Sequence, residues 1–216
     1  ALQNDVVSPQ THQRRAAAAQ TGVTVAGEYL RAQEQHAMAE TIAKVLYPED
    51  NHPEGKSLRL KQQYFFVSAT VQSIMRKHIE VYGTAANFHE KNVIQINDTH
   101  PTLIIPELMR LLLDDDGLGW DEAWDIVTAC VNYTNHTVMS EALETWPVGL
   151  MHYLLPRHMR IIFRINQEFL NEVAQRFPGD IDLIRRVSLI DHADGNPDNK
   201  RVRMAHLCIV GSHRIN

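Results

Sequence analysis

Apolar residues recur at helical spacing in three long stretches of the chain. In residues 58–82 they fall alternately three and four positions apart and extend around the surface, which predicts a mostly buried helix. Helix formers dominate residues 28–46, and a third, amphipathic helix is predicted over residues 156–177, before Pro178-Gly179. The density of Pro, Asp, Asn and Gly in residues 47–55 predicts a loop between the first two helices.

Three short apolar runs are expected to form strands, and polar residues follow each of them. The expected strands are residues 93–96, 130–133 and 207–210. The polar segments that follow them are residues 97–100, 134–137 and 211–213, respectively. Shorter helices are predicted at 106–113, 121–129 and 181–187, with Asp121 placed to cap the second. Because helices rather than two-residue turns separate the strands, the chain is predicted to be an α/β layer with a largely parallel sheet.

The polar residues that follow these runs supply amide, hydroxyl, imidazole and carboxylate groups. In open α/β sheets ligands gather beyond the carboxyl ends of the strands, and this mixture of donors and acceptors suits the hydroxyl groups of a sugar ring. The same residue types are also ordinary in turns and at helix ends. Spacing alone therefore leaves a binding site and a set of structural turns as open alternatives.

Composition narrows the class of protein. The 216 residues carry a net charge of -5 and are 44% hydrophobic, which is typical of a globular domain. No basic stretch predicts binding to nucleic acid or to a membrane surface, and no apolar run approaches the length of a membrane span. Two separated cysteines and the lack of a signal-peptide pattern favour the cytoplasm. The Ala-rich residues 1–27 are expected to form an arm before a domain at 28–216.

Familiar catalytic signatures are missing from the sequence. It contains no glycine-rich phosphate loop, no Gly-x-Ser-x-Gly elbow and no His-Glu-x-x-His motif. Its histidines invite a metal hypothesis, but His100, His136 and His213 come from separate segments without the spacing of ligand pairs. No metal site is predicted.

A set of ordered motifs resembles one known family. The motifs are Tyr47-Pro48-Glu49-Asp50-Asn51, Leu58-Arg59-Leu60-Lys61-Gln62-Gln63-Tyr64-Phe65, Asn97-Asp98-Thr99-His100-Pro101, Tyr133-Thr134-Asn135-His136-Thr137, Glu141-Ala142-Leu143-Glu144 and Leu155-Pro156-Arg157-His158-Met159. In this order, and over about residues 27–216, the chain resembles the α-glucan phosphorylases, which include the glycogen, starch and maltodextrin phosphorylases.

The resemblance implies both a fold and a reaction. Members of the family fold as two Rossmann-like domains of the GT-B type of glycosyltransferase, and this chain is similar to a helix-rich part of the N-terminal one. They transfer terminal α-1,4-linked glucosyl units of a glucan to inorganic phosphate, which releases glucose 1-phosphate. The resemblance further implies a pyridoxal phosphate cofactor, held by a lysine that this chain lacks, and a homodimeric full-length parent. On this interpretation the chain is a fragment and is inactive alone.

The resemblance also assigns roles to individual residues. His136 is similar to the family's catalytic histidine, whose main-chain carbonyl lies near the anomeric carbon and whose ring reaches the glucose 6-hydroxyl. Asn51 resembles a mobile-loop asparagine that binds a glucose hydroxyl, with Asp50 beside it in the gate. The remaining substrate-binding positions are Asp98 and His100 on the acceptor side and Thr137 next to the glucosyl subsite.

The sequence departs from the family pattern in places, and other functions stay open. His52-Pro53 replaces aromatic loop residues of the vertebrate enzymes, which puts their inhibitor-stacking site in doubt here. Arg76-Lys77 matches part of their basic patch near the nucleotide effector site, but the following segment 79–89 differs from theirs, so activation by AMP is not expected. The missing half of the active site leaves a non-catalytic glucan-binding module as the alternative function. A hydrolase would need two carboxylates about the scissile bond, for which Asp98 and Glu141 are the candidate pair.

Overall fold

The computed structural model describes residues 30–31, 33–34, 36–37, 40–44, 48–49, 51–192 and 199–216. The chain divides into two units, Ala1–Glu49 and Asp50–Asn216. In the first unit, all described residues from 30 to 44 are helical and nearly all are exposed, which confirms the predicted helix where it can be seen. The proposed arm at 1–27 lies outside the described residues.

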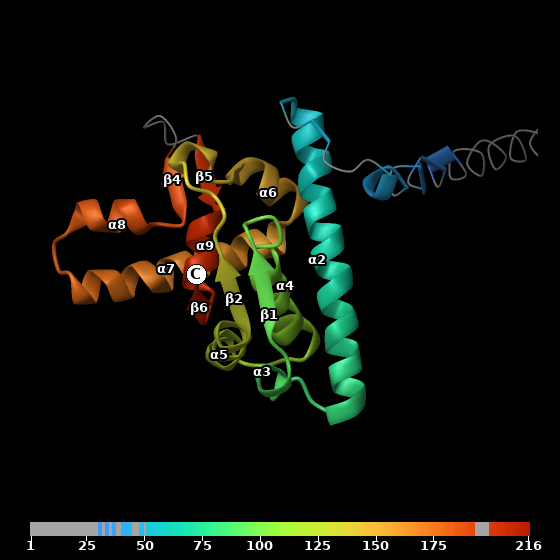
Figure 1. Ribbon diagram of the computed structural model, residues 1–216, viewed down its shortest axis with the longest axis horizontal. Helices are drawn as coiled ribbons and strands as arrows, with labels where there is room; N and C mark the ends of the chain where they lie inside the picture. Colours follow the sequence, from blue (N-terminus) through green and yellow to red (C-terminus); the bar gives the residue numbers. More distant parts are fainter. Residues whose placement is uncertain are drawn as a thin grey trace, which may run out of the picture. The chain divides into compact units, whose positions relative to one another are not determined.

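The second unit is a helix-rich α/β arrangement (Figure 1). Its described helices are α2 (Pro53–Tyr82), α3 (Phe88–Lys91), α4 (Ile104–Arg110), the π-helix η1 (Leu111–Asp115), α5 (Trp120–Cys130), the 3-10 helix η2 (Ser140–Ala142), α6 (Val148–Leu154), α7 (Pro156–Arg176), α8 (Ile181–Val187) and α9 (Met204–Val210). Its described strands are β1 (Ile94–Asn97), β2 (Val131–Thr134), β3 (Thr145–Pro147), β4 (Ile190–His192), β5 (Lys200–Arg203) and β6 (Arg214–Ile215).

The described strands form two sheets. One has the order β1-β2-β6 and is parallel throughout, which confirms the predicted parallel sheet. The other, β3-β5-β4, is antiparallel and was not predicted, because its strands are only three or four residues long and carry little apolar pattern. None of the described helices is both long and apolar enough to cross a membrane.

The long helix α2 begins earlier than predicted. Its first residue is Pro53, so the predicted loop at 47–55 is shorter than expected, because proline is well tolerated at the first position of a helix. The helix ends at Tyr82 and is capped by Gly83, whose backbone is left-handed with φ 74° and whose N–H donates to the carbonyl of Ile79. Near this end His78 bonds to Asn87 and Asn92, which attaches α2 to the segment around α3.

Two sequence predictions about short segments were wrong. The apolar run at 207–210 is not a strand but the end of α9, because a run of four apolar residues does not distinguish a buried helix from a buried strand. Ser212 and His213 therefore precede β6 instead of following a strand. Asp121 does not cap α5; the helix begins after Gly119, and Asp121 lies in its first turn, where its charge favours the helix dipole.

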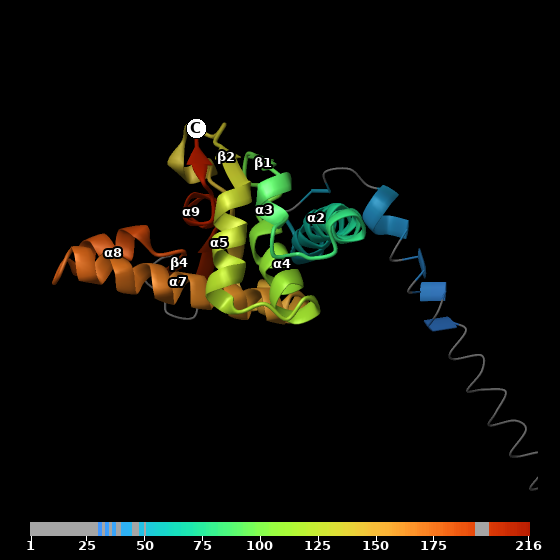
Figure 2. The same ribbon diagram turned by 90° about the horizontal axis from the view of Figure 1, so that it is seen from below.

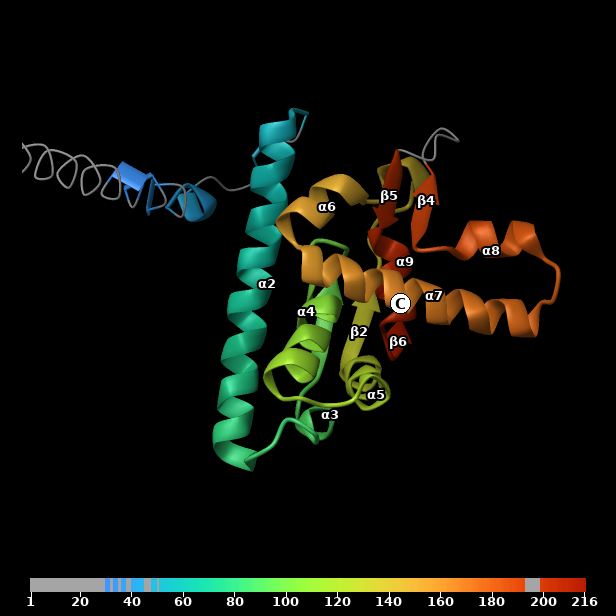
Figure 3. The same ribbon diagram turned by 180° about the vertical axis from the view of Figure 1, so that it is seen from behind.

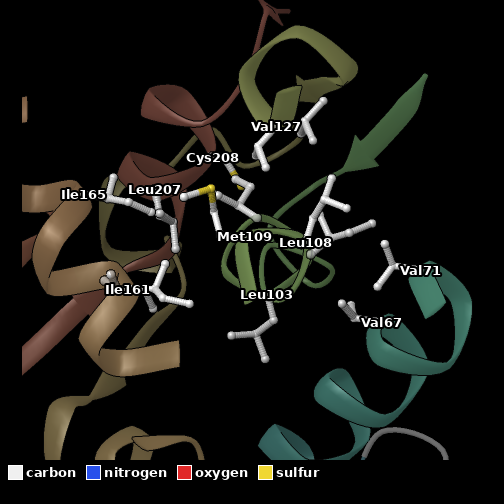
Figure 4. Packing of buried hydrophobic residues seen from close by; sticks show 14 of the residues in the cluster. Val67, Val71, Leu103, Leu108, Met109, Val127, Ile161, Ile165, Leu207 and Cys208 are labelled. Carbon is white, nitrogen blue, oxygen red and sulfur yellow. The ribbon is translucent and has the colours of Figure 1, made fainter. Parts of the chain in front are cut away.

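The core lies on one side of the parallel sheet. Alternate strand residues Ile96, Val131 and Tyr133 are buried, whereas Gln95 and Asn97 on the other face are exposed. Helix α4 packs against α2, α5 and α7, and α3 packs against α5 (Figures 2 and 3). Figure 4 shows side chains of the central cluster, from Val67 and Val71 on α2 to Leu207 and Cys208 on α9.

An acidic side chain lies inside this helical layer. Glu107 on α4 is completely buried and accepts hydrogen bonds from Ser68 at 2.8 Å and from Arg110 at 3.0 Å. His158 on α7 lies 2.5 Å from the same carboxylate. Burial opposes ionisation of Glu107, but the bonds from His158, Arg110 and Ser68 outweigh it and lower the pKa of the carboxyl group to about 2. The carboxylate therefore joins α2, α4 and α7 as an anion.

Candidate functional site

The carboxyl ends of β1 and β2 bring several polar side chains together. The two strands are parallel neighbours, with Asn97 opposite Thr134 in the register. The turns that follow both strands therefore leave the same edge of the sheet. We call the polar residues of these turns the strand-end group: Asn97, Asp98, His100, His136 and Thr137.

The turn after β1 is held by Asp98. This residue has a left-handed backbone with φ 61°, a conformation that Asp tolerates better than most residues. Its N–H donates to the carbonyl of Thr134, and its carboxylate accepts from the N–H of Thr99 at 2.6 Å. The second carboxylate oxygen lies 3.4 Å from the hydroxyl of Thr137, which donates to it. Asp98 therefore connects the two turns as well as shaping its own.

The turn after β2 presents His136 to solvent. Asn135 fixes this turn, because its side-chain oxygen accepts from the N–H of Thr137 and its amide donates to the carbonyl of the same residue. The imidazole Nε2 of the exposed His136 lies 2.5 Å from the side-chain oxygen of Asn97. The predicted neighbours Asp98, His136 and Thr137 thus do meet at one edge of the sheet. Asn97 belongs with them; the sequence placed it among the polar residues after the first strand but gave it no individual role.

A second layer of hydrogen bonds lies beside the strand-end group. Glu144 accepts from the buried hydroxyl of Thr99 at 2.8 Å and from the amide of Gln63 on α2 at 2.6 Å. The backbone carbonyl of Glu144 accepts from the N–H of Met204 at the start of α9. Sequence reasoning missed this junction. The one sequence feature that could have indicated it was Gln63 on a helix predicted to be mostly buried, because a buried side-chain amide needs a hydrogen-bond partner.

The groups underneath the site are kept neutral. Burial raises the pKa of the Cys208 thiol to about 12, and the nearby carboxylates of Glu144 and Asp98 also raise it. Burial raises the pKa of the Tyr133 hydroxyl to about 12 as well. The thiol of Cys208 lies 2.9 Å from the hydroxyl of Thr102. Neither Cys208 nor Tyr133 is therefore an ionised nucleophile at neutral pH.

Within the strand-end group, His100 is exposed in the turn after β1. The candidate residues outside this group lie apart in the chain or outside what is described. Asn51 is exposed just before α2. Asp50, the other predicted gate residue, lies outside the described residues. Glu141 is exposed on η2 and accepts from its neighbour Ser140. Within the described part of the chain, no three side chains are grouped so as to hold a metal ion.

A separate cavity of about 520 Å³ lies among α5, α7 and α9. Its walls combine apolar residues such as Trp124 and Phe169 with the carboxylates of Asp121, Asp125 and Glu172. No member of the strand-end group lines it. The cavity is therefore distinct from the strand-end group.

Comparisons with known proteins agree on one family. Residues 11–216 match the family described as carbohydrate phosphorylase. The chain is 52% identical to the muscle form of glycogen phosphorylase from Mus musculus over 198 residues, and equally so to the muscle form from Homo sapiens. It is 54% identical over 190 residues to glycogen phosphorylase 2 from Dictyostelium discoideum. Each match covers 88% of this chain, but only 23% of the two mammalian relatives and 19% of the third.

Proposed function

We propose, from the premise that this chain belongs to the carbohydrate phosphorylase family, that it is part of an α-glucan phosphorylase. The whole protein would transfer terminal α-1,4-linked glucosyl units of glycogen or maltodextrin to inorganic phosphate and release glucose 1-phosphate. The names of the similar proteins, all glycogen phosphorylases, support this reaction. Its partners on this proposal are an α-1,4-glucan and phosphate, with no nucleic acid and no membrane.

The observation that carries the proposal is the strand-end group. Two adjacent parallel strands deliver carboxylate, amide, hydroxyl and imidazole groups to one edge of the sheet, which is the chemistry that sugar hydroxyls require. We assign the catalytic role to His136: its main-chain carbonyl would stabilise the positive charge that develops at the anomeric carbon, and its ring would bind the 6-hydroxyl. Asp98 and His100 would line the acceptor side, and Thr137 the glucosyl subsite.

The segment before α2 would complete the substrate site. We assign Asn51 to a glucose hydroxyl and Asp50 to the gate beside it. We further propose that residues 28–216 are part of the N-terminal Rossmann-like domain of a two-domain GT-B glycosyltransferase, preceded by an arm at 1–27. The whole protein would be a cytoplasmic homodimer.

Pyridoxal phosphate does not fit the strand-end group. The cofactor needs a lysine for its aldehyde and cationic or backbone donors for its phosphate, whereas the side chains of the strand-end group include no lysine or arginine. The cofactor would therefore be held outside the strand-end group, and the family resemblance assigns its lysine to a part of the whole protein that this chain does not include. The residues of this chain would bind and orient the glucan, and they would not hold the cofactor.

The proposal is tested with the full-length protein. Incubation with maltodextrin, phosphate and pyridoxal phosphate should yield glucose 1-phosphate. If no glucose 1-phosphate forms, the proposed reaction is contradicted. A second measurement addresses the alternative of a non-catalytic glucan-binding module. Binding of maltoheptaose by the 216-residue chain alone, measured by calorimetry, would favour the module if the full-length protein also lacks phosphorolysis.

A further inference from the structure

We propose that Asn97 is a positioning residue for His136, fixing the ring so that Nδ1 faces the sugar. This inference rests on the proposed function, because it deepens the role assigned to the His136 ring. It concerns a residue to which neither the family resemblance nor the comparisons assign a role. The observation behind it is the 2.5 Å approach of His136 Nε2 to Asn97 Oδ1.

The backbone places the two side chains next to each other. Asn97 is the last residue of β1 and lies opposite Thr134, the last residue of β2, so His136 follows only two positions later. A second bond, from the hydroxyl of Thr137 to the carboxylate of Asp98, joins the same two turns. Asn97 and Asp98 of the turn after β1 thus contact His136 and Thr137 of the turn after β2. The bond between Thr137 and Asp98 holds the two turns together, and the contact with Asn97 limits the rotation of the His136 ring.

The chemistry of the amide determines which ring nitrogen faces the ligand. The side-chain oxygen of Asn97 only accepts hydrogen bonds, so the Nε2 atom beside it carries a proton. In the neutral imidazole, Nδ1 is then the acceptor, and it is available for a sugar hydroxyl. The hydrogen bond at one nitrogen thereby sets both the orientation of the ring and the function of the other nitrogen.

A neighbouring amide on the same strand provides a matched control. Gln95 is also exposed on this face of β1, but its amide donates to the hydroxyl of Thr134 at 3.0 Å and lies 3.4 Å from the carbonyl of Ile96. It is thus bound locally within the sheet. Replacing it removes an amide from β1 without removing the partner of His136.

The experiment uses the full-length protein and measures glucan extension from glucose 1-phosphate, with 6-deoxyglucose 1-phosphate as the second substrate. Asn97→Leu should lower kcat/KM for glucose 1-phosphate about tenfold, because one well-placed hydrogen bond to the 6-hydroxyl is lost. The same variant should change kcat/KM for 6-deoxyglucose 1-phosphate less than about twofold, since that sugar lacks the hydroxyl. Asn97→Asp, which keeps the acceptor oxygen, should retain most activity, and Gln95→Leu should resemble the wild type.

The outcomes separate this inference from the proposed function. A wild-type protein without phosphorylase activity would contradict the proposed function itself. An active wild type in which Asn97→Leu has no effect, or affects both sugars equally, would overturn the positioning role. Equal loss in Asn97→Leu and Asn97→Asp would also overturn it, because the acceptor oxygen would then be irrelevant.

Discussion

At the scale of single residues, Glu107 has the most unusual environment among the described carboxylates. It is fully buried, yet it stays ionised, because donors from three helices surround it. A charge in such a place is stabilising only while its partners remain, since removing one member leaves the others buried and unpaired. The exposed pair Arg157–Asp114 is chemically similar but lies at the surface, where solvent screens it.

We expect Glu107→Gln to reduce the free energy of unfolding by about 3 kcal/mol at neutral pH, because His158 and Arg110 lose their anionic partner. Urea unfolding of the full-length protein and its variants measures this. Asp114→Asn is the control, and it should cost less than about 1 kcal/mol. Equal effects of the two substitutions would contradict the assignment.

The same carboxylate predicts a pH dependence. The pKa of Glu107 is about 2 in the folded protein and 4.5 ordinarily, so its stabilising contribution is complete above about pH 4.5. It is lost as the pH falls from there towards 2. The Glu107→Gln variant should not show this part of the loss of stability in acid. If its free energy of unfolding depends on pH in the same way as that of the wild type, another group is responsible.

At the scale of elements, the long helices and the parallel strands β1 and β2 were predictable, and the antiparallel sheet was not. Helices α2 and α7 follow from spacing, because many positions support each of them. In the antiparallel sheet, β3 pairs with β5 from about 55 residues away, which no local pattern reveals, and β4 and β5 are only three and four residues long. The meeting of Asp98 with Thr137 followed from the parallel-sheet rule. The contact between Asn97 and His136 did not, because it depends on register and side-chain direction.

Helix α9 ends against α4 at a point where a Cβ atom would crowd the side chain of Ile105. A Cβ atom on Gly211 would lie 2.7 Å and 2.9 Å from side-chain carbons of Ile105. We expect Gly211→Ala to destabilise the protein by about 1–3 kcal/mol through overpacking. Gly149→Ala in α6 is the matched control, because nothing lies within 4 Å of its Cβ. That control should be neutral or stabilising by up to about 1 kcal/mol. Differential scanning fluorimetry compares the two, and equal melting temperatures would contradict the overpacking argument.

At the scale of the whole molecule, Glu144 joins segments that are distant in sequence. Its side chain binds α2 and the turn after β1, and its backbone binds the start of α9. The candidate site is therefore supported by α2, the turn after β1 and the start of α9, which are distant from one another in the sequence. Sequence patterns predicted α2 and β1, but the hydrogen bonds of Glu144 form only when these elements pack together, so no local pattern indicates them.

We expect Glu144→Leu to cost about 2 kcal/mol of stability, because the buried hydroxyl of Thr99 and amide of Gln63 lose their acceptor. Urea unfolding of the full-length variant measures the change. Glu141→Leu, three residues earlier and exposed, should have little effect. Similar losses in both variants would show that the Glu144 junction does not support the fold.

The junction at Glu144 also has a consequence for the order of folding. Its two side-chain bonds join residues 81 and 45 positions apart in the chain. Contacts that close such long loops form late in folding, because the chain loses conformational entropy before the contact stabilises it. Helices such as α2 need only local contacts and can form first. During refolding, the arrangement of the strand-end group should therefore appear with the slowest phase, after most of the helical signal has returned.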